Sequence, residues 1–122
     1  MNLDMDNFAK GIKFFNEGNY FEAHETWEEQ WRGLEKSSEK YFIQGLIMVA
    51  VALYHYKRKN YTGTSRLIEK GIHLLKEFKE PKMKIDIDDF LKEIGMFQEK
   101  FKSSRQCIPD KEFPRIKKLD IF

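Results

Sequence analysis

A histidine and a glutamate stand where the sequence predicts the apolar side of a helix. The segment Gly18–Trp31 reads GNYFEAHETWEEQW. Plotted as a helix, it gathers most of its aromatic residues on one face, with His24 near the centre and Glu28 one turn further on. A buried polar group without a partner costs about 1–3 kcal/mol. The two side chains therefore either satisfy each other and hold the fold together, or serve a chemical function.

The next apolar segment adds two polar residues to this pair. If residues 41–59 run antiparallel to the first segment, Gln44 lies beside Glu28, and His55 lies beyond His24 near the preceding turn. The candidate catalytic residues are His24, Glu28, Gln44 and His55. The candidate ligand-binding residues are His24, Glu25, Glu28, Trp31 and Gln44.

A histidine and a carboxylate four residues apart suit a hydrogen-bonded acid and base, or part of a metal site. The HExxE spacing lacks the second histidine of the zinc-protease motif HExxH, and the Glu-x-x-His pairs of di-iron bundles do not occur. His55 lies about 9 Å too far along its helix to join the pair. We expect no metal ion and no cofactor, and the sequence favours a structural polar network over a small-ligand or catalytic cluster.

Other reaction chemistry has little support in the sequence. The single cysteine, Cys107, has no histidine near it in the chain and is not expected to be a nucleophile. The sequence contains no glycine-rich phosphate loop and no CxxC spacing. Trp27 and Trp31 are expected in the core rather than as a stacking platform.

Hydrophobic periodicity predicts five helices and no strand. The third is apolar nearly all round and is therefore expected at the centre. The expected helices run from Asp4 or Asp6 to about Asn16, from Tyr20 to Gly33, from Tyr41 (with a start near Ser38) to about Lys59, from Tyr61 or Thr62 to Lys79, and from Asp88 to Lys102.

Composition agrees with a single all-α domain. The chain has 122 residues, of which 41% are hydrophobic and only three are proline. We expect a compact five-helix bundle over residues 1–102, followed by an irregular C-terminal tail over residues 103–122. The tail carries four large apolar residues, which favour docking on the body over exposure to water: Phe113, Ile116, Leu119 and Phe122.

Charge and hydropathy exclude some partners. Residues 1–56 hold nine acids and five bases (net −4), and residues 57–122 hold eleven acids and seventeen bases (net +6). Pairing between the two halves explains this asymmetry more simply than nucleic acid does. The longest apolar run, 46–54, is about half a membrane span, so no membrane segment is expected. A single cysteine and an acidic N-terminus predict a cytoplasmic protein.

The sequence also contains a weak internal repeat. The segments NYFEAHETWE and NYTGTSRLIE begin at Asn19 and Asn60, 60 − 19 = 41 residues apart. Each follows a helix and a short turn, and the small and aromatic positions resemble the tetratricopeptide repeat, whose usual period is about 34 residues. The resemblance implies two helical hairpins plus a closing helix. The second unit has no histidine where the first has His24, so the scaffold itself does not require one.

Residues 8–75 resemble a known family, the bacterial and archaeal domain of unknown function 309 (DUF309). The segments FNEGNYFEAHETWEEQWR and FIQGLIMVAVALYHYKRKNY carry the resemblance. It implies a small all-helical bundle whose role is unassigned, and it draws attention to the same polar residues. The family positions here are Gly18, Tyr20, Phe21, Glu22, His24, Glu25, Glu28, Trp31, Gln44, Gly45 and His55.

These observations predict a helical module of unknown function that binds a protein or peptide without catalysing a reaction. In this interpretation His24, Glu28 and Gln44 form a buried polar cluster. The alternative is a small-ligand or metal-dependent enzyme, hydrolase-like, that uses His24 and Glu28 as its site. Nucleic acid is not an expected partner, and the oligomeric state is left open by the sequence.

Overall fold

A computed structural model describes residues 4–78, 83–104 and 108–119, so Cys107 and Phe122 lie outside the described residues. Within the described residues the chain forms α-helices and one short 3-10 turn, with no β-strand, and the predicted all-α class is confirmed. No helix in this part of the chain is long and apolar enough to cross a membrane. The elements are α1 (Met5–Asn16), α2 (Tyr20–Gly33), α3 (Ser38–Lys57), α4 (Tyr61–Leu75), α5 (Ile87–Ser103) and the 3-10 turn η1 (Asp110–Glu112).

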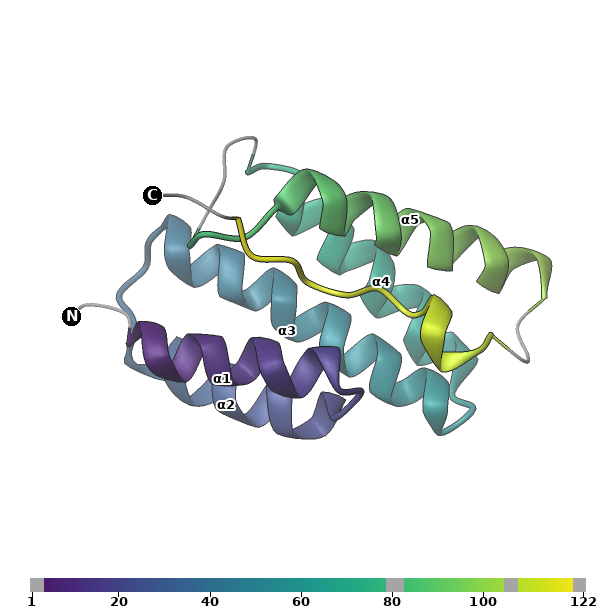
Figure 1. Ribbon diagram of the computed structural model, residues 1–122, viewed down its shortest axis with the longest axis horizontal. Helices are drawn as coiled ribbons and strands as arrows, with labels where there is room; N and C mark the ends of the chain where they lie inside the picture. The colour runs from purple at the N-terminus through teal and green to yellow at the C-terminus, as the bar shows by residue number, and fades with distance from the viewer. Residues whose placement is uncertain (1–3, 79–82, 105–107, 120–122) are drawn as a thin grey trace.

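The helices form two layers with α3 in the middle of one of them (Figure 1). Helix α3 packs between α2 and α4, while α1 covers α2 and α5 covers α4. The segment that follows α5 runs between α1 and α5 and crosses α3 on the side facing the viewer. Because α3 has neighbours on both flanks and on this side, it can be apolar over most of its circumference.

Local signals in the sequence account for the helix starts. The side chains of Asp4, Ser37, Asn60 and Asp86 each accept a hydrogen bond from a backbone N–H in the first turn of the helix that follows. These bonds satisfy donors that have no partner within the helix. The two Asn-Tyr pairs of the repeat occupy equivalent places, since α2 and α4 each begin at the tyrosine.

One helix boundary differs from the prediction. Helix α4 ends at Leu75, before the predicted end at Lys79, which lies outside the described residues. The chain turns there, and the Phe78 ring packs edge-on against Phe42 of α3, with ring centroids 5.2 Å apart. Burial of this aromatic pair favours leaving the helix axis over another helical turn.

Helices α1 and α2 are joined by a close contact between a glycine and a tryptophan. The Trp27 ring is completely buried, and its Nε1–H donates a hydrogen bond of 3.3 Å to the backbone oxygen of Phe8. A Cβ placed on Gly11 would lie 2.2 Å from Trp27 Nε1. Only glycine therefore leaves room for the indole ring at this point of α1.

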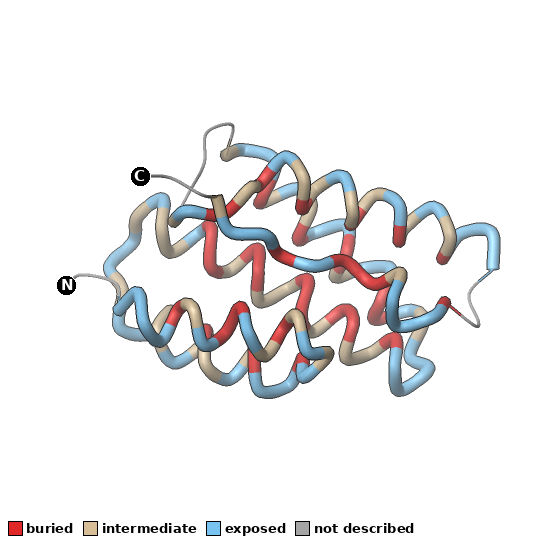
Figure 2. The backbone as a smooth tube through the Cα atoms, in the orientation of Figure 1, coloured by how far each residue is buried: buried red, intermediate tan, exposed pale blue. Residues whose placement is uncertain are grey.

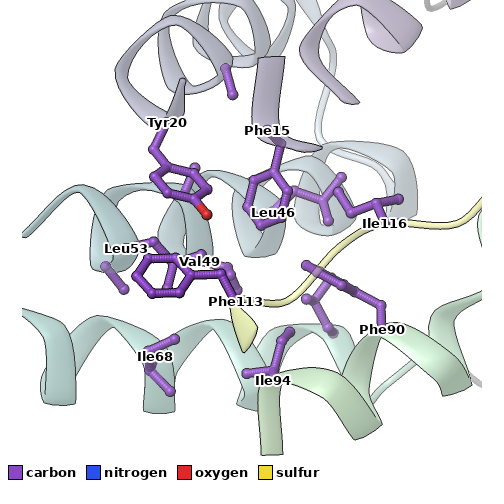
Figure 3. Close-up of a cluster of buried hydrophobic side chains, with 14 of the residues drawn as sticks. Phe15, Tyr20, Leu46, Val49, Leu53, Ile68, Phe90, Ile94, Phe113 and Ile116 are labelled. Carbon is purple, nitrogen blue, oxygen red and sulfur yellow. The ribbon is translucent and has the colours of Figure 1, made fainter. Parts of the chain in front are cut away.

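The core runs along α3 and contains side chains from each of the five α-helices. Figure 2 shows the buried residues concentrated on α3 and on the sides of α1, α5 and the C-terminal segment that face it. In Figure 3, residues of all five helices and of the C-terminal segment converge on one cluster. The labelled members are Phe15, Tyr20, Leu46, Val49, Leu53, Ile68, Phe90, Ile94, Phe113 and Ile116.

Polar contacts fix the C-terminal segment, residues 108–119, on the helices. The Asn16 side chain pairs with the backbone of Ile116 in both directions: its Nδ2 donates to the Ile116 oxygen and its Oδ1 accepts from the Ile116 N–H, both at 2.8 Å. The N–H of Ile108 donates to the hydroxyl of Tyr56 at 3.1 Å. These bonds satisfy backbone groups of a segment that has almost no secondary structure of its own.

Candidate functional site

The buried side of α2 is narrower than the predicted apolar arc, because Phe21 is exposed and Trp31 is only half-buried. Its buried residues are Tyr20, Ala23 and Trp27, and they face α1 and the interior. His24 and Glu28 lie at the edge of this arc, and their side chains remain 22% and 31% exposed. The expectation of a buried polar cluster is therefore wrong, because contact with α1 draws the buried arc away from His24 toward Ala23.

The predicted pairing of these two residues is present in the structure. His24 Nε2 lies 2.7 Å from Glu28 Oε2, and Arg32 binds the other carboxylate oxygen of Glu28 at 2.5 Å. The three side chains form a ladder along one edge of α2, each one turn from the next. This arrangement orients the imidazole through Nε2.

Gln44 does not join this pair. Within the described residues it makes no hydrogen bond to Glu28, whose two oxygens bind His24 and Arg32. Gln44 instead lines a cavity of about 420 Å³ on the side of α3 that faces α4. The prediction of a His-Glu-Gln cluster fails here, because the rotation of α3 about its axis places Gln44 toward α4. The other lining residues are Met48, Glu69, Lys70, His73 and Leu74.

His55 contacts the start of α4. The sequence had instead predicted a position near the turn before α2. Its Nδ1 lies 3.4 Å from Asn60 Nδ2, and Asn60 Oδ1 accepts a hydrogen bond from the N–H of Gly63 at 3.0 Å. The amide of Asn60 donates to the imidazole, so Nδ1 is the acceptor and Nε2 carries the proton. His55 thereby orients the residue that caps α4.

The two remaining candidate ligand-binding residues, Glu25 and Trp31, have different surroundings. Glu25 is exposed on the outer edge of α2. Trp31 is half-buried, its ring lies 4.3 Å beneath Lys40 Nζ, and its buried indole N–H has no hydrogen-bond partner among the residues that the structure describes. Within residues 4–78, 83–104 and 108–119, no group of three or more His, Cys, Asp or Glu side chains is placed to hold a metal ion.

Sequence reasoning missed a surface feature beside the candidate residues. Four apolar residues on one side of α3 are only half-buried, and we call them the open stripe: Ile47, Met48, Val51 and Tyr54. Phe21 of α2 is 48% exposed, and its ring packs against Tyr54 with centroids 5.7 Å apart. The signal was the absence of a polar face on α3, which the sequence analysis took to mean burial on all sides.

Loss of the Glu28 charge should have a small effect on stability. In Glu28→Gln we expect the free energy of unfolding to fall by less than about 1 kcal/mol, because ion pairs that remain partly exposed contribute little. Urea denaturation followed by circular dichroism measures the change. A loss of about 3 kcal/mol would instead indicate that the pair holds the fold together. Glu29→Gln, on the exposed side of α2, is the control.

Comparison with known proteins bears out the family resemblance. Residues 8–67 match the family described as Domain of unknown function (DUF309). The uncharacterized protein YpuF of Bacillus subtilis (strain 168) is 39% identical over 64 residues, which are 52% of this chain and 37% of that protein. The match thus covers well under half of the relative's length. Residues 8–67, about half of this chain, are thus similar to the DUF309 family.

Proposed function

We propose that this chain is a non-enzymatic docking module that binds an amphipathic helix of a partner protein on the face formed by α2, α3 and α4. The open stripe of α3 carries the proposal. A helix without a polar face is normally covered on every side. Here the packed neighbours of α3 lie on its two flanks and on the side of the C-terminal segment. The side chains of the open stripe remain partly exposed to solvent.

The shape of this face suits a helix. The stripe lies on α3 between α2 and α4, and we call this face the groove; at Gln44 and Met48 it holds the cavity of about 420 Å³ that α4 helps to line. From Gln44 to His55 the partly exposed side of α3 extends about 16 Å, or three helical turns. An amphipathic helix laid into such a groove places its apolar residues on the stripe and keeps its polar side in water.

The charges on the two sides of the groove differ. Helix α2 carries four glutamates against the single Arg32, and Glu25 and Glu28 follow Phe21 by four and seven residues, on the same face of the helix. Helix α4 carries Arg66 and Lys70 against the single Glu69. A partner helix with basic residues along one edge and acidic residues along the other complements both sides and is fixed in one orientation.

A designed peptide tests the proposal. The probe is a fluorescent peptide of about 18 residues with a leucine stripe, lysines along one edge and glutamates along the other, and fluorescence anisotropy measures its binding. We expect saturable binding that weakens at least about tenfold in Val51→Lys, because a lysine in the stripe would be desolvated by the peptide. Phe21→Ser should weaken binding in the same direction.

Met96→Lys is the matched control. Met96 is 55% exposed on α5, away from the groove, and its replacement should leave peptide binding unchanged. Equal binding by wild type, Val51→Lys and Met96→Lys would overturn the proposal, as would absence of binding to wild type. A concentration-dependent dimer that Val51→Lys dissociates would show that the groove is covered by a second copy of this chain, which also overturns it.

We place this module in the cytoplasm. A chain with one cysteine forms no internal disulfide, as is usual for proteins of reducing compartments. Fractionation of cells that express the protein with an epitope tag tests the assignment, and recovery outside the cytoplasmic fraction would contradict it.

A further inference from the structure

A small cavity of about 140 Å³ lies where three distant parts of the chain meet. The turn between α1 and α2 forms one wall, the end of α3 contributes Lys57, and residues 110–115 of the C-terminal segment close the cavity. The cavity therefore exists only when the C-terminal segment is docked. None of the residues of the open stripe lines it, and its function does not depend on the proposed docking of a helix.

The charges around this cavity are not paired with one another. Three cationic side chains line it, Lys57, Lys111 and Arg115, together with two carboxylates, Glu17 and Asp110. None of the five takes part in an ion pair with a described residue. The set carries one net positive charge, and the positive end of the α2 dipole adds to it at Tyr20, the first residue of that helix.

Two of these cations have defined places. Lys57 Nζ lies over the rings of Tyr20 and Phe113, 5.4 Å and 5.9 Å from their centroids. It lies only 3.3 Å from the position of a Cβ on Gly18, whose φ of +83° also favours glycine. Arg115 donates one hydrogen bond of 3.1 Å from Nη2 to the backbone oxygen of Asn16, which positions its guanidinium beside the cavity.

A tyrosine, Tyr20, also lines the cavity. Tyr20 is only 4% exposed, and its hydroxyl makes no hydrogen bond with any described residue. Burial, followed by the charge of Asp110, raises the pKa of Tyr20 above its usual range, while Arg115 acts in the opposite direction. The hydroxyl therefore stays protonated at neutral pH and is available as a donor. A ligand that accepts a hydrogen bond from this hydroxyl would gain binding free energy from it.

We propose that this cavity binds the carboxylate of a small organic acid, held by Lys57, Lys111 and Arg115 and by the hydroxyl of Tyr20. One negative charge brings the cationic and acidic side chains to neutrality, whereas a phosphate dianion leaves an excess of negative charge in a partly enclosed site. At about 30 Å³ for each water-sized group, the volume admits about four or five non-hydrogen atoms, the size of acetate.

The probe for this site is sodium acetate, and the readout is the amide spectrum of the full ¹⁵N-labelled chain at constant ionic strength, maintained with sodium chloride. We expect saturable shifts at Gly18, Tyr20, Lys57 and residues 110–115. In Tyr20→Phe the dissociation constant should rise about five- to tenfold, the effect of losing one hydrogen bond. Lys57→Gln should raise it at least as much.

Matched variants separate loss of the site from loss of the fold. Tyr61→Phe removes the hydroxyl from the equivalent tyrosine of the second repeat unit, and Lys102→Gln removes an exposed lysine of α5, so both should bind acetate like wild type. Unchanged melting temperatures show that Tyr20→Phe remains folded. Absence of saturable shifts up to about 50 mM acetate, or equal affinity in Tyr20→Phe and Tyr61→Phe, would overturn the site. Tighter binding of inorganic phosphate than of acetate would overturn its assignment to a carboxylate.

Discussion

Replacement of Gly11 by alanine is expected to lower the free energy of unfolding by about 2–3 kcal/mol, among the larger effects of any single methyl group in this protein. The added Cβ would lie 2.2 Å from Nε1 of Trp27 and 2.6 Å from Cδ1 and Cε2. The indole ring is completely buried and hydrogen-bonded to the backbone of Phe8, so it cannot move without breaking that bond or displacing α1. In a domain of this size we expect the melting temperature to fall by about 8–12 °C.

Gly95→Ala is the matched control for this substitution. Gly95 lies within α5, and a Cβ placed there meets no atom within 4 Å. Alanine loses less backbone entropy than glycine in a helix, so the control should stabilise the protein by about 0.5–1 kcal/mol. Opposite signs for the two variants in thermal and urea denaturation support the close packing of α1 on α2. A neutral Gly11→Ala would contradict it.

The helices and their starts could be predicted because their signals are local. An aspartate directly precedes α1 and another precedes α5, and the side chains of Asp4 and Asp86 accept backbone N–H bonds at the starts of these helices. The Asn-Tyr repeat also predicted two equivalent helix starts, which α2 and α4 share. Such signals lie within a few residues of the boundary and do not depend on the rest of the fold.

The orientation of each helix about its own axis could not be predicted in the same way. Tyr20 and Phe21 are adjacent aromatic residues on different sides of α2, and either could belong to the core. In the structure Tyr20 is buried and Phe21 is exposed, because α1 covers the side of α2 that carries Ala23 and Trp27. Which of the two rings is buried depends on how α1 packs against α2. The same packing decides whether His24 is buried.

The candidate site could be predicted in part for the same reason. The contact between His24 and Glu28 lies within one helix, and the spacing of four residues was enough to predict it. Contacts of Gln44 and His55 depend on how α3 is rotated against α2 and α4. A rotation that differs from the assumed one moves Gln44 toward α4 and brings His55 to Asn60.

The cavity at Tyr20 could not be predicted from the sequence. Tyr20 and Tyr61 occupy equivalent positions in the repeat, yet the ring of Tyr61 packs against Tyr56 and Phe101. What distinguishes Tyr20 is the C-terminal segment, which arrives from about 90 residues further along the chain. A repeat predicts that two residues occupy equivalent positions in the backbone. The side chains that contact each of them depend on how the whole chain packs.

Replacement of Phe113 by alanine is expected to release this C-terminal segment and to destabilise the whole protein by about 3–4 kcal/mol. The ring is buried and packs against Tyr20, Tyr56 and Phe97, with centroids 6.1, 5.6 and 5.3 Å apart. It thus joins α2, α3 and α5 at one point. Urea denaturation measures the loss, and Phe21→Ala, at an exposed phenylalanine, should cost less than about 1 kcal/mol.

Trypsin distinguishes release of the segment from general destabilisation. Lys111, Arg115 and Lys117 are cleavage sites within the segment, and docking protects their backbone from the protease. In Phe113→Ala, cleavage there should become at least about tenfold faster while the helices stay intact, because the segment then opens locally at low free energy. If cleavage instead spreads over the helices at the same rate, the segment and the helices unfold together. Unchanged cleavage would mean that the paired hydrogen bonds of Asn16 with Ile116 hold the segment without the ring.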